Sequence, residues 1–217
     1  MKFGGKKMNN KGAWLLRPRP HGILRINEFI ENNIIAIGWP NIGNLEGKSK
    51  EDIKEILQNE PYNLTSTSLG NALSTIDILV NQMNIGNLIL IPNENDIYIG
   101  EVKSDYKYDP TKDNDTEGYP HQREIKILKK IERNSLPIDI KTSLRVIKTT
   151  ANLTKYFDKI KLISEGQEIK NLEEESNFME VEYPIRPNVN VKITLPKDLT
   201  EQEADRLGNF LKTIYFI

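Results

Sequence analysis

The sequence contains no cysteine among its 217 residues and only two histidines, His21 and His121. Without thiols the chain can form no disulfide framework, no thiolate metal site and no cysteine nucleophile, and two histidines cannot make a multi-histidine metal site. Long hydrophobic runs are also missing, since Ile34 to Ile37 and Leu88 to Ile91 fall far below the roughly 20 residues that span a bilayer. We therefore expect no transmembrane helix, no resident metal and no cofactor.

Acidic side chains are missing from the first 25 residues, although the whole chain is nearly neutral, with 30 Lys and Arg against 31 Asp and Glu. The charged residues of this segment are Lys2, Lys6, Lys7, Lys11, Arg17, Arg19 and Arg25. Between Glu165 and Glu182 the bias is reversed, because Lys170 is the only basic residue among many glutamates. The basic segment is either an ordinary solvated face or a surface that binds a polyanion. Because it has no apolar core of signal-peptide length, we expect a cytoplasmic protein.

Helical periodicity is clearest from Leu69 to Met83, where apolar residues recur at three- and four-residue intervals on one stripe. Ser49 is placed to cap the N-terminus of an earlier helix. Near the end of the chain, an alternating strand from Val189 to Leu195 precedes Thr200 to Glu203, which is a capping box for a last helix.

Strand patterns occupy the middle of the chain. Alternating runs at 88–91 and 97–103, joined by the turn-rich segment 92–96, predict a β-hairpin, and further strands are expected at 34–39 and 123–128. Helices inserted between the strands of a small mixed sheet make an α+β fold. We place one domain at residues 1–160 and assign 161–217 to an acidic linker followed by a small strand-helix unit.

Aromatic and basic side chains gather between Tyr98 and Arg123. The members of this group are Tyr98, Tyr106, Tyr108, Tyr119, His121, Gln122 and Arg123. Tyrosine rings stack on bases, and Arg or His contacts phosphates and base edges, so the group suits a nucleobase; each tyrosine could equally be an ordinary strand residue. Trp14 and Trp39 could grip a flipped base between aromatic faces, although one of the two is expected to fill the core.

Glu101 and Lys103 form an E-x-K pair at the end of a strand, as in metal-dependent nucleases. In that chemistry two carboxylates hold a divalent cation while the lysine positions or activates water. The second carboxylate is not at its usual place, because Asp77 falls inside a helix and Glu94 and Asp96 fall in the turn. Phosphate-binding glycine loops, zinc-protease motifs and serine-hydrolase elbows are absent, which favours a binding protein over an enzyme.

A family resemblance rests on the order and spacing of several short motifs. They are Ala13-Trp14-Leu15-Leu16-Arg17, Glu28-Phe29-Ile30, Ile35-Ala36-Ile37-Gly38-Trp39, Ile85-Gly86-Asn87-Leu88-Ile89, Tyr98-Ile99-Gly100-Glu101-Val102, Tyr106-Lys107-Tyr108-Asp109-Pro110 and Tyr119-Pro120-His121-Gln122-Arg123. Over residues 13–157 the chain resembles the N-terminal domain of Mrr-like restriction-system proteins. That domain is in turn similar to PUA-like β-barrels of the EVE and YTH type, which read modified bases. The chain departs from the pattern at Ile127, where the family usually has tryptophan.

The resemblance implies a small PUA-like (EVE-like) β-barrel with inserted helices that reads modified or flipped bases in DNA, without catalysis, in a bacterial restriction or phage-defence system. The DNA-binding residues we expect are Trp14, Arg17, Arg19, Trp39, Tyr106, Tyr108, His121 and Arg123. The tail from Tyr183 to Leu207 is similar to a short unit of bacterial defence proteins, so it is expected either to dock a separate nuclease or effector or to stabilise the barrel. The alternatives are an Mg-dependent nuclease using Glu101 and Lys103, and a small-nucleotide sensor that acts as an adaptor.

Overall fold

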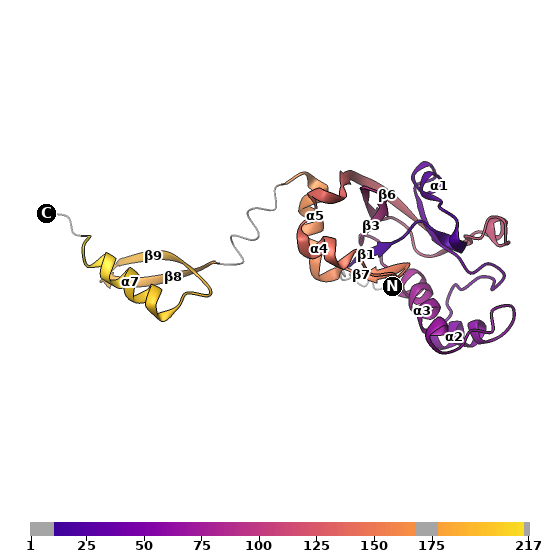
Figure 1. Ribbon diagram of the computed structural model, residues 1–217, viewed down its shortest axis with the longest axis horizontal. Helices are drawn as coiled ribbons and strands as arrows, with labels where there is room; N and C mark the ends of the chain where they lie inside the picture. Colours follow the sequence, from indigo (N-terminus) through magenta and orange to yellow (C-terminus); the bar gives the residue numbers. More distant parts are fainter. Residues whose placement is uncertain (1–10, 168–177, 215–217) are drawn as a thin grey trace, which may run out of the picture. The chain divides into compact units, whose positions relative to one another are not determined.

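A computed structural model describes residues 11–167 and 178–214, and the chain divides into two units, 1–166 and 167–217 (Figure 1). Lys2, Lys6 and Lys7 of the basic segment lie outside the described residues, as does the part of the acidic segment at 168–177. The boundary expected after residue 160 falls within helix α5 (Phe157–Glu165), which packs on strands β3 and β6 of the first unit.

The first unit is a mixed α+β structure built on a seven-stranded sheet in the described residues. Its strands are β1 (Ala13–Leu16), β2 (Ile34–Ile37), β3 (Leu88–Asn93), β4 (Asp96–Val102), β5 (Lys107–Tyr108), β6 (His121–Glu132) and β7 (Thr150–Asn152). They are arranged in the order β2-β6-β4-β3-β1-β7, with β5 paired beside β6. β1 runs parallel to β3, and the other neighbours are antiparallel. The predicted hairpin at 88–103 is confirmed as β3 and β4.

β6 curls the sheet because its two halves pair with different partners. Its first part, 121–124, pairs with β2, and the part from 125 to 132 pairs with β4. The register with β4 shifts between Ile99 and Gly100, so that Leu128 is an extra residue on β6, and a bulge of this kind bends a strand. The result is a curled half-barrel, which agrees with the predicted mixture of helices and a small barrel-like sheet.

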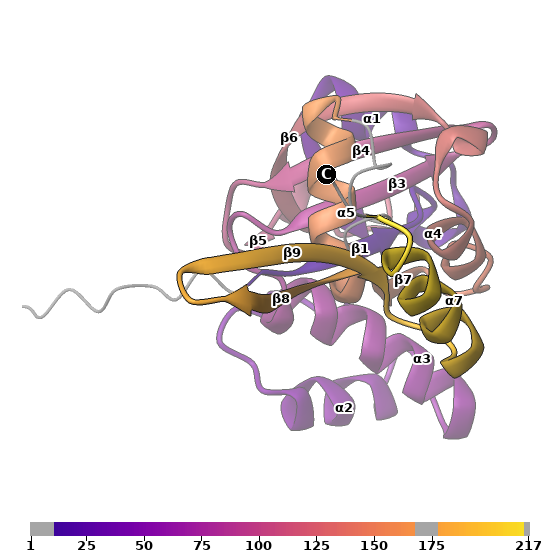
Figure 2. The same ribbon diagram turned by 90° about the vertical axis from the view of Figure 1, so that its left-hand side faces the viewer.

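Helices cover both faces of this sheet (Figures 1 and 2). They are α1 (Ile26–Glu31), α2 (Lys50–Gln58), α3 (Ser66–Asp77), α4 (Ile138–Ser143) and α5, and a π-helical turn, Ile78–Gln82, extends α3. Ser49 caps α2 as predicted, since its hydroxyl accepts from the Asp52 amide at 3.1 Å and Asp52 reciprocates. The predicted stripe from Leu69 to Met83 is buried along most of its length against α2 and the sheet.

The second unit contains the hairpin β8 (Phe178–Arg186) and β9 (Val189–Pro196), followed by helix α7 (Glu201–Leu211). β9 and the Thr200 to Glu203 capping box were expected, and both hydrogen bonds of the box are present. β8 was missed, because Glu180 and Glu182 were counted with the acidic linker. Neither unit contains, in its described residues, a helix long and apolar enough to cross a membrane.

Candidate functional site

The residues expected to bind DNA do not form one cluster. Trp14 is 5% exposed within β1, and its indole Nε1 donates a hydrogen bond to Asn87 Oδ1 at 2.9 Å. It is the tryptophan that fills the core. Arg17 donates to the carbonyl oxygens of Leu144, Val146 and Lys148 at 2.9 to 3.2 Å. This arginine therefore holds the loop between α4 and β7 to the end of β1.

His121 has no exposed surface and belongs to a hydrogen-bonded chain of fixed direction. Its Nε2 lies 3.2 Å from the Trp39 carbonyl oxygen, which can only accept, so Nε2 carries the proton. Nδ1 therefore accepts from the Tyr106 hydroxyl at 2.8 Å, and that hydroxyl accepts from the Leu45 amide at 3.2 Å. Burial lowers the pKa of His121 to about 4 and raises that of Tyr106 to about 12, so both are neutral. His121 is enclosed by the fold in this conformation, and its hydrogen bond holds the backbone of Trp39.

Arg123 is also committed to the fold, with 3% exposure. Its guanidinium donates to the carbonyls of Leu79 and Val80, at 2.5 and 2.9 Å, and to the Ser104 carbonyl at 3.0 Å. The first two carbonyls belong to the π-helical turn. Burial lowers the pKa of Arg123, but the arginine stays charged. In this structure the donors of Arg123 face backbone, which gives the side chain a structural role.

Tyr108 on β5 is connected through Asp113 to the segment that follows β2. Its hydroxyl donates to Asp113, and this hydrogen bond is the main reason that the pKa of Tyr108 rises to about 12. The other carboxylate oxygen of Asp113 accepts from the Asn41 amide. Tyr62 adds a third anchor, since its hydroxyl donates to the Pro40 carbonyl at 2.9 Å. Three consecutive residues, 39 to 41, are thus each held by a hydrogen bond from a different part of the fold.

Trp39 is partly exposed on this anchored segment, with φ of 66° in the left-handed region. It is shared by two adjoining cavities of about 240 and 280 Å³, which we call the Trp39 groove. Tyr62 and Thr149 contribute to its walls. Its charged side chains are Arg19 on one cavity and Lys148 on the other, and the described residues place no carboxylate in either lining. Of the predicted residues, the structure brings Trp39 and Arg19 together here.

The groove also contains residues that the sequence gave no reason to select. Ile147 lies on the wall of the groove's cavity of about 280 Å³ and is fully exposed, at 101% of its reference area. Tyr62 and Thr149 belong to loops without a recognisable motif. The signal that could have drawn attention to Ile147 is its setting with Val146 between Arg145 and Lys148, where an apolar pair has no strand or helix pattern to explain it.

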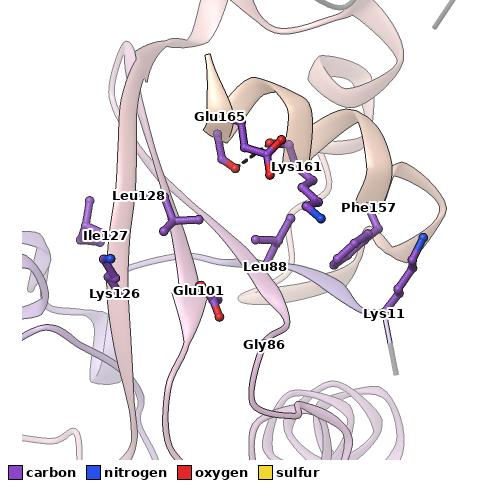
Figure 3. Close-up of a pocket in the computed structure, with 11 residues that line it drawn as sticks. Lys11, Gly86, Leu88, Glu101, Lys126, Ile127, Leu128, Phe157, Lys161 and Glu165 are labelled. Atoms are coloured by element: carbon purple, nitrogen blue, oxygen red, sulfur yellow. Dashed lines mark hydrogen bonds between the residues drawn. The ribbon is translucent and has the colours of Figure 1, made fainter. Parts of the chain in front are cut away.

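Glu101 and Lys103 lie away from the Trp39 groove. They share one face, as an E-x-K pair must, with Lys103 Nζ 2.7 Å from Glu101 Oε1. Glu101 lines a cavity of about 490 Å³ together with Lys126 and Lys161, between the sheet and α5 (Figure 3). Across residues 11–167 and 178–214 there is no group of three or more His, Cys, Asp or Glu side chains that could hold a metal.

Ile127, the position at which the chain departs from the Mrr-like pattern, also lines the cavity in Figure 3. It follows Lys126 on β6, just before the bulged Leu128. Ile127 therefore contributes to the cavity beside α5 and lines neither cavity of the Trp39 groove.

Comparison with known proteins adds one finding. None of the curated proteins matches the chain significantly. Residues 24–154 match the family model described as a domain of unknown function, DUF8426. The match includes Trp39, His121 and Ile147 and stops short of the second unit. Because it covers more than half of the chain, the protein belongs to the DUF8426 family.

Proposed function

We propose that the first unit is a non-enzymatic reader of DNA that accepts a modified or flipped base against the Trp39 ring. The observation that carries the proposal is the anchoring of the backbone at residues 39 to 41, which fixes the segment that presents a partly exposed indole to two adjoining cavities. A ring that is ordered before binding loses little conformational entropy when a base stacks on it. Stacking on an aromatic side chain contributes about 1 to 3 kcal/mol per base.

The charges of the groove support a phosphate-bearing ligand. Arg19 lines one of the two cavities and Lys148 lines the other, and no described lining residue is acidic. Both side chains are exposed, so they can reach a backbone that passes over the groove. Their contacts with phosphate release counterions, which makes the affinity depend on salt.

Ile147 completes the arrangement for flipping a base in this proposal. Arg17 holds the backbone on both sides of this residue, through the carbonyls of Val146 and Lys148, while the isoleucine side chain is left in solvent. An apolar side chain presented rigidly beside an aromatic pocket suits insertion into the base stack, where it fills the space of the extruded base. In this proposal Arg17 acts by positioning the loop.

The likeness to the N-terminal domain of Mrr-like restriction proteins supports a role in a bacterial restriction or phage-defence system. The chain would recognise the DNA, and a separate protein would supply the nuclease. Recognition and cleavage would then be divided between two partners.

Fluorescence anisotropy tests the proposal with duplexes that carry unmodified cytosine, 5-methylcytosine, 5-hydroxymethylcytosine or N6-methyladenine. We expect one modification to bind preferentially and Trp39→Ala to weaken that binding by about tenfold to a hundredfold, the equivalent of one lost stacking contact. Phe157→Ala is the matched control, because it removes an aromatic ring from the other cavity and should leave binding unchanged.

Two results would count against a DNA reader. Equal loss in both variants would show that the effect is not specific to the groove. Thermal stabilisation by mononucleotides, with no binding of oligonucleotides, would support the small-nucleotide sensor instead.

A further inference from the structure

The cavity between the sheet and α5 has a floor formed by a row of opposed residues. Leu88 on β3 pairs with Glu101 on β4, and Glu101 pairs with Lys126 on β6. Directly opposed residues of antiparallel strands point to the same side, so these three side chains stand on one face of the sheet. All three line the cavity of about 490 Å³, with α5 on its other side (Figure 3). This volume lies within the range of roughly 300 to 1,000 Å³ that small-molecule sites occupy.

Helix α5 is connected to the rest of the first unit near both of its ends. Near its start, Asp158 forms an ion pair with Lys11 at 3.0 Å. Near its end, the ammonium group of Lys129 on β6 donates to the Ile163 carbonyl oxygen at 3.1 Å. Ile160, between these two points, is fully buried. The fold therefore sets the shape of the cavity before any ligand enters, which lowers the entropic cost of binding.

Two of the three lysines that line the cavity have no acidic partner. Within the described residues, the ammonium groups of Lys126 and Lys161 form no ion pair and no hydrogen bond. The charges of Lys11 and Glu101 are each matched by an ion pair. Lys161 extends from α5 toward the strands (Figure 3). Three lysines against two glutamates leave the lining positive, and the two unmatched ammonium groups favour an anion with more than one charge.

The remaining lining suits an aromatic group that also carries hydroxyl or amino groups. Phe157 offers a partly exposed ring in the same cavity as Leu88 and Leu128. Glu165, the last residue of α5, forms no ion pair in the part of the chain that the structure describes, and its carboxylate can accept from a hydroxyl or amino group. A nucleoside combines these features, because its base stacks on an aromatic ring while its ribose and base carry the donors.

We propose that this cavity binds a nucleoside monophosphate, with the phosphate between Lys126 and Lys161 and the base against Phe157. A phosphate monoester carries a charge of about −1.5 to −2 at pH 7, whereas a carboxylate supplies only one charge. Lysine ammonium groups bind phosphate as point charges. The site is separate from the Trp39 groove, and the proposal does not depend on whether that groove binds DNA.

Equilibrium dialysis of the full-length chain tests the site with the ribonucleoside 5′-monophosphates of adenine, guanine, cytosine and uracil. We expect at least one to bind with a Kd of about 100 micromolar or tighter, and inorganic phosphate or the corresponding nucleoside to bind at least about tenfold more weakly. Lys161→Gln and Phe157→Ala should each raise the Kd about tenfold, since one removes a charge and the other a stacking surface.

Lys155→Gln is the matched control. It removes the same charge from the turn directly before α5, at a lysine that lines neither this cavity nor the Trp39 groove, and should leave the Kd unchanged. Trp39→Ala should also leave the Kd unchanged, which separates this site from a nucleotide bound in the groove. Trp14 is buried in β1, so its fluorescence shows that the first unit remains folded in each variant.

Four results would overturn the proposal. The first is that none of the monophosphates binds. The second is that inorganic phosphate or the nucleoside binds as tightly as the monophosphate, because the cavity would then not recognise both parts of the ligand. The third is an unchanged Kd for Lys161→Gln, or an equal increase for Lys155→Gln. The fourth is loss of binding in Trp39→Ala, which would place the nucleotide in the groove.

Discussion

At the scale of single residues, His121 makes the stability of the first unit depend on pH. Its folded pKa of about 4 lies below the ordinary value of 6.5 because the ring is buried. The unfolded chain therefore binds a proton at a higher pH than the folded chain does. The stabilising effect of a neutral His121 is fully present above pH 6.5, decreases as the pH falls toward 4, and changes no further below that.

We expect the first unit to lose about 2 kcal/mol of unfolding free energy through His121 between pH 7.5 and pH 5. Urea titrations followed by tryptophan fluorescence measure this loss. His121→Gln should remove that part of the pH dependence, whereas His21→Gln, at an exposed histidine, should retain it. Identical pH profiles for wild type and His121→Gln would contradict the buried neutral state.

A second prediction at this scale concerns Ile147. If it fills the stack, Ile147→Ala should reduce the fluorescence increase of 2-aminopurine at the target position by about fivefold while weakening overall binding less than Trp39→Ala does. Ile138→Ala is the matched control, because Ile138 is 70% exposed on α4 and lines neither cavity of the groove. Equal effects of the two isoleucine variants would show that Ile147 is an ordinary surface residue.

At the scale of elements, β6 and the π-helical turn depend on Arg123. The guanidinium donates hydrogen bonds to carbonyls of both the turn and the loop after β4, in a geometry that an ammonium group cannot reproduce. Arg123→Lys should therefore destabilise the first unit by about 3 kcal/mol, because buried carbonyls lose their donors. Lys126→Met, on the exposed face of the same strand, should change stability by less than about 0.5 kcal/mol in the same urea titrations. A mild effect of Arg123→Lys would show that water satisfies those carbonyls.

The elements that could be predicted are those with local signals. The caps at Ser49 and Thr200 and the apolar stripe of α3 are specified by residues close together in the sequence, and the structure confirms them. The parallel pairing of β1 with β3 depends on distant contacts and has no local signal. β7 is too short for a pattern, and β8 was hidden by its acidic residues.

The candidate site was less predictable, for a physical reason that β6 illustrates. His121, Arg123 and Ile125 are spaced two residues apart on β6, so their side chains all point to the buried face of the strand. The two polar side chains therefore lie inside the fold. Their chemistry suggested a ligand, yet their hydrogen bonds go to backbone carbonyls and to the Tyr106 hydroxyl. Trp39 could be selected because it is an aromatic residue beside a proline, whereas Tyr62 and Thr149 reach the groove only through the tertiary fold.

At the scale of the whole molecule, the near-neutral charge conceals a local cationic groove. If Arg19 and Lys148 each contact a phosphate, alanine at either position should reduce the slope of log affinity against log salt by about 0.9. Anisotropy titrations at several salt concentrations measure the slope. Lys126→Ala, at the cavity between the sheet and α5, should leave the slope unchanged. A reduced slope for this variant instead would place the DNA at that cavity.

The position of β1 in the sheet has a consequence for how the protein is made. This strand comes from the first described residues, but it lies between β3 and β7, and β7 ends at Asn152. Pairings between distant segments form late, because a long loop must close before they contribute. During synthesis β1 emerges early and then lacks β7 until nearly all of the first unit has left the ribosome. The nascent chain therefore keeps an apolar strand available for incorrect pairing, which makes the interval before residue 152 the stage at which a chaperone would matter most.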